Sequence, residues 1–243
     1  MYFRQNYSCN AGRKPMSIML KIFIPLCFFS IILMCSCEDR QSTSKRDDHT
    51  KHAVSCSDSK TIPWNLKELF NSPRFIWIDT ESHIRSILYE GLSYQGNPMN
   101  TFAYYSTPGL VTGDRSKDKD LPAVVLIHSW GSSATPQWVE LWARRGYAAI
   151  SMDLNGLGPD RKRLDNAGPP AQDYMSDVWN YHGLARIVLA HSLIRSFPEV
   201  DEDRTAITGV SVGGHLVCSV IGIDTRFKAA VPVYGCGFLH EID

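Results

Sequence analysis

The chain has 243 residues, and its 25 basic and 25 acidic side chains give a formal net charge of zero at pH 7. This length is enough for one large α/β domain with an additional segment. The charge balance argues against a nucleic-acid partner, which would require a basic surface. The seven cysteines include no Cys-x-x-Cys pair, and none has the spacing to histidine that a zinc site needs. The sequence therefore predicts neither nucleic-acid binding nor a metal site.

Residues 1–37 have the pattern of an export signal. Basic residues precede an apolar stretch over 18–35, which ends in Ser36 and Cys37 before a polar region. Its uncharged core is shorter than the roughly 20 residues that span a bilayer comfortably. The segment resembles a bacterial lipoprotein signal, and this resemblance implies that Cys37 is the acylated anchor, with Cys35 as a competing position. Plain secretion and an uncleaved anchor are the alternatives.

Residues 38–60 are polar and mixed in charge, with almost nothing to bury. This composition predicts a flexible tether rather than a folded element. The predicted domain therefore comprises residues 61–243. A lipid anchor followed by this tether would hold the exported domain at a membrane of the bacterial cell envelope.

The first part of the domain predicts a short helix and the beginning of a sheet. The helix is expected over 62–69 and a brief strand over 75–78. Two further strands, over 84–89 and 101–106, are separated by turn-forming residues, which indicates an antiparallel pair. A charged loop over 113–120 follows.

The unbroken apolar run 123–127 is typical of a strand buried on both faces of a parallel sheet, and residues 147–152 are expected to form another buried strand. Between them, Thr135 and Pro136 are expected to begin a helix as its N-cap and first residue, and Gly146 to end it. Each run is followed by polar or glycine-containing segments. The pattern predicts a strand, a helix and a second strand.

Residues 154–180 form a long stretch rich in glycine, proline and charge, and loops of this length often line active sites. A helix is expected over 181–197 and a strand over 204–208, followed by a helix over 212–222 and a strand over 227–234. Strands and helices thus alternate from the first buried strand onward. This alternation predicts a parallel, doubly wound sheet with right-handed crossovers.

The segment Gly209-Val-Ser-Val-Gly-Gly214 matches the G-x-S-x-G pattern of a nucleophile elbow. Glycines leave room for a strand that reverses sharply into a helix. The backbone of Ser211 at the apex is expected to be strained, with its hydroxyl exposed. The first N–H groups of the helix point at the same spot, so the amide of Val212 would stabilise an oxyanion formed there.

With the elbow, the turn over 128–131 and the alternation of elements, residues 84–239 resemble the α/β-hydrolases. They are most similar to bacterial acetyl xylan esterases and to the related dienelactone hydrolases and prolyl oligopeptidases. The resemblance implies that Ser211 is the nucleophile of a two-step acyl transfer and that the amides of Trp130 and Val212 form the oxyanion hole. It implies a serine carboxylic ester hydrolase that removes acetyl groups from plant polysaccharide and uses no cofactor.

The triad acid and histidine that the resemblance requires are not identified in this chain. In α/β-hydrolases they follow the nucleophile in the order acid, then histidine. After Ser211 the histidines are His215, on the elbow helix, and His240, after the wrong strand. The expected fold is therefore an α/β-hydrolase with a doubly wound, mostly parallel sheet that lacks the last strands, as in a truncated esterase. The alternatives are a prolyl-oligopeptidase-like peptidase and a catalytically inactive, truncated or binding remnant that lacks the triad acid and histidine.

Several other side chains have a structural reading and a functional one. His128 precedes the nucleophile and is expected to shape the oxyanion turn rather than to act as a base. Asp153 ends a strand, where it would contact substrate or cap a loop. His191 is expected to be a buried structural histidine. Trp138 and Trp142, four residues apart on a helix, are expected to pack in the core rather than to stack on a sugar.

Overall fold

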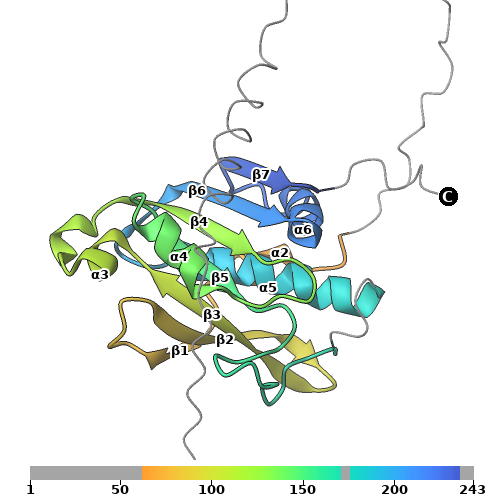
Figure 1. Ribbon diagram of the computed structural model, residues 1–243. Helices are drawn as coiled ribbons and strands as arrows, with labels where there is room; N and C mark the ends of the chain where they lie inside the picture. The colour runs from red at the N-terminus through yellow and green to blue at the C-terminus, as the bar shows by residue number, and fades with distance from the viewer. Residues whose placement is uncertain (1–61, 171–175, 236–243) are drawn as a thin grey trace, which may run out of the picture. The chain divides into compact units, whose positions relative to one another are not determined.

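The computed structural model describes residues 62–170 and 176–235 (Figure 1). The expected signal over 1–37, with Cys37, and the tether over 38–60 lie outside the described residues. In the described ranges, no helix is both long enough and apolar enough to cross a membrane.

A seven-stranded sheet forms the centre of the fold, in the order β1-β2-β3-β5-β4-β6-β7 (Figure 1). The strands are β1 (Phe75–Asp79), β2 (Arg85–Tyr94), β3 (Asn97–Ser106), β4 (Leu121–Ile127), β5 (Ala148–Met152), β6 (Val200–Val210) and β7 (Ala229–Val233). Strands β5, β4, β6 and β7 are mutually parallel, whereas β1, β2, β3 and β5 are joined by antiparallel pairings. Because β2 is antiparallel to β3, and β3 to β5, β2 runs in the direction of the parallel four. The prediction of a mostly parallel sheet is confirmed.

Helices cover both faces of the sheet, as a doubly wound fold requires. They are α2 (Leu66–Leu69), α3 (Pro108–Thr112), α4 (Pro136–Ala143), α5 (Asp177–Arg195) and α6 (Val212–Ile221), with a short 3₁₀ turn at Arg115–Lys117. Side chains of α5 and α6 belong to the larger apolar cluster on one face. Val139 of α4 belongs to a separate cluster on the other face, against which Trp138 and Trp142 pack. The expected core role of these two tryptophans is confirmed.

Strand β4 lies between these two clusters. Ala123, Val125 and Ile127 face the α5 and α6 side, and Val124 and Leu126 face the α4 side. All five side chains are buried. This burial on both faces explains why the sequence of β4 is apolar without alternation.

The hairpin of β2 and β3 is longer than expected. Its turn consists of Gln95 and Gly96, which both have positive φ, the conformation that matches the twist of a two-residue hairpin. Gly91 and Pro98, expected in the connection, therefore lie within strands. Helix α3 was not expected; Thr107 caps it by accepting a hydrogen bond from the amide of Leu110 at 3.2 Å.

Helix α5 also differs from its expected bounds. It begins at Asp177 rather than at residue 181, because the Ser176 hydroxyl accepts a hydrogen bond from the Trp179 amide at 3.1 Å. Asp177 then provides a negative charge in the first turn, where the helix dipole favours it. This earlier start brings Trp179 into the helix, at the carboxyl edge of the sheet.

Candidate active site

Ser211 occupies the reversal between β6 and α6, as predicted. Its backbone has φ of 57° and ψ of −118°, a region that residues other than glycine rarely adopt. The Ser211 amide donates a hydrogen bond to the carbonyl of Val233 at 2.8 Å. The Ser211 carbonyl accepts one from the backbone amide of His215 at 3.0 Å. These two bonds fix the strained apex, and the residue is exposed to solvent.

Close approach of backbone segments explains the three glycines of the elbow. A Cβ atom on Gly209 would overlap the carbonyl of Gly213, and one on Gly213 would overlap the carbonyl of Ile127. On Gly214, a Cβ would lie 2.7 Å from the carbonyl of Val233. The first turn of α6 therefore packs directly against the ends of β4 and β7, and only glycine permits this contact.

The turn after β4, residues 128–131, is held in place by His128. Its Nε2 accepts a hydrogen bond from the Leu154 amide at 2.9 Å, so Nδ1 carries the proton and donates to the carbonyl of Ser129 at 2.8 Å. Burial lowers the pKa of His128, outweighing the opposite effect of Asp153, and the ring is neutral at pH 7. The ring joins this turn to the segment after β5, which confirms its expected structural role.

Trp130 and Val212, the expected oxyanion donors, line one small hollow of about 10 Å³. They come from the end of β4 and the first position of α6, and the Gly213 contact brings these elements together. The first amides of a helix have no acceptor within it, so that of Val212 is oriented outward. A space of this size holds a single oxygen-sized group. The Trp130 side chain beside it is 61% exposed.

Other residues of this hollow were missed at the sequence level. Leu154 and Asn155 belong to the long segment that was expected to line an active site, and both line this hollow. Trp179 also lines the hollow, but the helix that carries it was expected to begin later. The signal that could have found it is the adjacent Ser176 and Asp177, a helix N-terminus pattern.

The described histidines do not supply a base for Ser211. Both ring nitrogens of His128 are used by the backbone, as shown above. His215 lies half-buried on α6, one turn beyond Ser211. Within the described ranges, no histidine forms a hydrogen bond with the Ser211 hydroxyl. His240 lies outside them.

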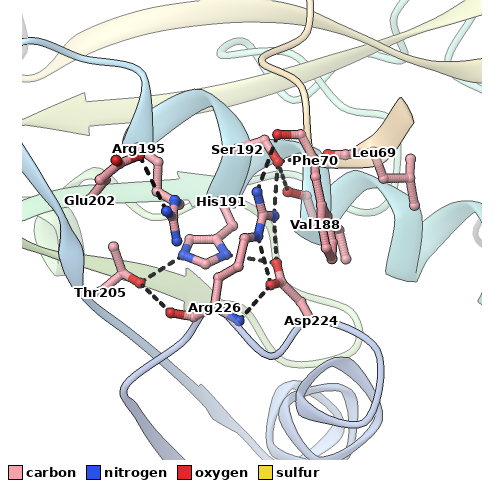
Figure 2. A network of polar contacts seen from close by, with 10 residues as sticks. All are labelled: Leu69, Phe70, Val188, His191, Ser192, Arg195, Glu202, Thr205, Asp224 and Arg226. Carbon is pink, nitrogen blue, oxygen red and sulfur yellow. Dashed lines mark hydrogen bonds and ion pairs between the residues drawn. The ribbon is translucent and has the colours of Figure 1, made fainter. Parts of the chain in front are cut away.

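His191 is buried on α5 in a separate polar network (Figure 2). Its Nδ1 donates to Asp224 at 2.7 Å, its Nε2 accepts from the Thr205 hydroxyl at 2.8 Å, and its ring stacks on Phe227. Thr205 lies six residues before Ser211 on β6, which corresponds to about 20 Å along a strand. The expectation of a structural histidine is therefore confirmed, despite the resemblance of this chain of contacts to a triad.

The charges of this network are set by burial and by Arg226. Burial lowers the pKa of His191 to about 4, although its contact with Asp224 acts in the opposite direction. Burial raises the pKa of Asp224, but hydrogen bonds from Arg226 and His191 outweigh this and hold it below its ordinary value. Arg226 contacts both carboxylate oxygens, at 2.8 and 2.7 Å. A neutral imidazole thus donates to an ionised carboxylate.

Residues 107–241, more than half of the chain, match the family model described as acetyl xylan esterase (AXE1). The chain belongs to the acetyl xylan esterase family. The matched region contains both the turn after β4 and the elbow. This family and the observed sheet establish the α/β-hydrolase fold.

Solved structures similar to this chain include two proteins that are also named acetyl xylan esterase. Acetyl xylan esterase from Paenibacillus sp. R4 is 24% identical with a TM-score of 0.44, covering 69% of this chain and 56% of that chain. Acetyl xylan esterase 1 from Thermoanaerobacterium sp. JW/SL YS485 is 16% identical with a TM-score of 0.48, covering 70% and 58%. The acylaminoacyl peptidase of Pyrococcus horikoshii is 16% identical with a TM-score of 0.45, covering 62% and 23%. This chain thus spans under two thirds of the length of each.

Proposed function

We propose that the protein is a serine hydrolase of carboxylic esters that removes acetyl groups from a plant polysaccharide. The observation that carries this proposal is the geometry at Ser211. A strained and exposed serine follows β6, and the next residue, Val212 at the start of α6, lines a hollow together with the turn after β4. Membership of the acetyl xylan esterase family supports the ester and the polysaccharide as the substrate class.

In the proposed reaction, Ser211 Oγ attacks the ester carbonyl and forms a tetrahedral intermediate. The amides of Val212 and Trp130 stabilise its oxyanion. Collapse of the intermediate releases the sugar hydroxyl and leaves the acetyl group on Ser211, from which water removes it as acetate. The serine proton passes to a general base and then to the departing sugar oxygen. That base is not identified among the described residues.

We also propose that the protein is exported and anchored to a bacterial membrane by a lipid on Cys37. The basic residues, the apolar stretch and the small residue before Cys37 support this proposal. An anchor followed by a polar tether would place the hydrolase at the cell surface, where a polysaccharide too large to enter the cell is accessible.

The function is tested with the full chain by two assays, hydrolysis of p-nitrophenyl acetate and release of acetate from acetylated xylan. Both activities are expected in the wild type and are expected to be lost in Ser211→Ala. Ser219→Ala is the matched control, because this serine lies on the same helix and its hydroxyl is bonded to the His215 carbonyl. Equal rates in wild type and Ser211→Ala would contradict the proposal. A preference for a prolyl amide over the ester would favour the peptidase alternative.

A further inference from the structure

Arg186 of α5 is the largest fully buried side chain among the described residues, with 1% of its surface exposed. Burial lowers the pKa of its guanidinium, and Tyr89 and Asp153 act in the opposite direction. Arginine stays protonated in proteins, so a positive charge lies inside the domain. Removing a charge from water is strongly unfavourable unless hydrogen bonds compensate for it. The partners of the guanidinium therefore indicate what this charge does.

The guanidinium bonds two backbone carbonyls of the segment after β5. Its Nη1 donates to the carbonyl of Leu154 at 2.9 Å, and its Nη2 donates to the carbonyl of Ala167. The chain also passes close to this group at Gly168, where a Cβ atom would lie 2.6 Å from Nη2. Both ends of the segment 154–168 are thus held by one side chain of α5.

Asp153 fixes the beginning of the same segment. Its Oδ1 accepts hydrogen bonds from the amides of Asn155 and Leu157, both at 2.8 Å, which confirms the expected loop cap. Its backbone amide donates to the carbonyl of Phe102 on β3 at 2.8 Å. Leu154 therefore lies between a capped strand end and a buried charge, and its backbone is held from both sides.

Leu154 connects Arg186 to the turn after β4. Its carbonyl accepts from Arg186, and its amide donates to His128 Nε2 at 2.9 Å. His128 in turn donates from Nδ1 to the carbonyl of Ser129 at 2.8 Å. Three hydrogen bonds thus lead from the guanidinium to the residue that precedes Trp130.

The last of these bonds sets the direction of the Trp130 amide. The Ser129 carbonyl accepts from the His128 ring and also from the Ser132 amide, at 3.2 Å. In a planar trans peptide, the carbonyl oxygen and the following N–H point in opposite directions. The N–H of Trp130 is therefore directed away from the His128 ring. A displaced ring would turn this peptide plane, and the N–H would turn with it.

We propose that Arg186 is a positioning residue for the oxyanion hole, which acts through Leu154 and His128 to fix the direction of the Trp130 amide. Its role in the reaction rests on the proposed function, in which this amide stabilises the oxyanion. Because Arg186 is almost completely buried, it acts on the reaction through these bonds. The oxyanion forms only after the substrate has bound, so the effect falls on kcat rather than on KM.

The kinetic test is hydrolysis of p-nitrophenyl acetate by the full chain. Arg186→Met keeps an apolar side chain and removes the donors, so kcat is expected to fall by about tenfold or more, with KM changed by less than about twofold. Arg186→Lys keeps the charge and a donor and is expected to retain more of kcat than Arg186→Met. Arg163→Met is the matched control, because this exposed arginine bonds the same segment at other carbonyls, those of Asn155 and Gly168. Its kcat is expected to equal that of the wild type.

A double-mutant cycle tests whether Arg186 acts through His128. His128→Asn keeps a donor for the Ser129 carbonyl but lacks the ring nitrogen that accepts from Leu154. If the two residues share one path, the double variant with Arg186→Met loses no more kcat than the worse single variant. Independent losses would multiply, and this result would overturn the proposal. Equal losses in Arg163→Met and Arg186→Met, or an unchanged kcat in a folded Arg186→Met, would also overturn it.

Nitrogen NMR of the histidine rings tests the chain of bonds without a substrate. His128 of the wild type is expected to carry its proton on Nδ1, and a proton on Nε2 would overturn the proposal even if no variant folds. The Nε2 signal is expected to shift in Arg186→Met, whose folding is established by thermal unfolding, and to stay in place in Arg163→Met. An unshifted signal in Arg186→Met would overturn the proposal. A wild type that shows these signals but hydrolyses no ester would contradict the proposed function instead, so the two failures are distinguishable.

Discussion

Protonation of His191 should limit the stability of this protein in mild acid. The ring is buried, donates to Asp224 at 2.7 Å and has a pKa lowered by burial to about 4, against 6.5 for the free side chain. Between these two values the unfolded chain binds a proton that the folded protein does not. The free energy of unfolding therefore decreases as the pH falls from 6.5 to 4. The difference in pKa corresponds to about 3 kcal/mol over this range.

The assay is urea unfolding followed by circular dichroism at several pH values between 4.5 and 7.5. His191→Gln cannot be protonated, but its amide keeps a donor for Asp224 and an acceptor for Thr205. The wild type is expected to lose up to about 1.4 kcal/mol per pH unit below pH 6 more than this variant does. His83→Gln, which removes an exposed histidine, is the matched control.

The lower limit of the pH range separates His191 from its partner. Asp224 has a folded pKa below its ordinary 3.8, so the stability that it contributes is present above that pH and is lost as the pH falls further. Measurements above pH 4.5 therefore report mainly on the imidazole. Identical pH dependence of wild type and His191→Gln would refute the reasoning, because it would mean that the buried ring does not resist protonation.

Three further predictions concern the elbow and the anchor. Gly213→Ala should lower the free energy of unfolding by about 1–3 kcal/mol, because the added methyl group meets the backbone of β4. Gly222→Ala, at the open end of α6, should change it by less than about 1 kcal/mol, and equal effects would contradict the close approach. Val212→Pro removes the proposed oxyanion donor at the first helical position, where proline is tolerated, so kcat for p-nitrophenyl acetate should fall by about 10²–10³. Val212→Ala keeps the amide and should keep the rate. An unchanged rate in the proline variant would exclude this amide as an oxyanion donor. Cys37→Ser should move the protein from the membrane fraction to the soluble fraction of cells, and unchanged fractionation would contradict the lipid anchor.

Local signals were sufficient for the parts of the fold that depend on a few neighbouring residues. The apolar run of β4 predicted a strand buried on both faces, and Thr135 with Pro136 marked the start of α4. The elbow was predictable because a sharp strand-to-helix reversal brings backbone segments too close for side chains, and its glycines leave the necessary space. Side-chain capping was less predictable, since the Thr135 hydroxyl bonds to the Ser133 carbonyl instead of to the helix.

Contacts between distant segments were not predictable in the same way. The burial of His191 follows from its helical face, but its partners Asp224 and Thr205 lie 33 and 14 residues away. The bond between the His128 ring and the Leu154 amide likewise joins residues 26 positions apart in the chain. No spacing in the sequence predicts such contacts, because they result from the order of the strands in the folded sheet.

The most direct test of the central claim is labelling of the full chain with a fluorophosphonate, followed by peptide mapping. An activated serine beside two oxyanion donors should take up one equivalent of the reagent, with the adduct on Ser211 and none in Ser211→Ala. A folded protein that forms no adduct, or forms it on another serine, would contradict the assignment of Ser211 as the nucleophile.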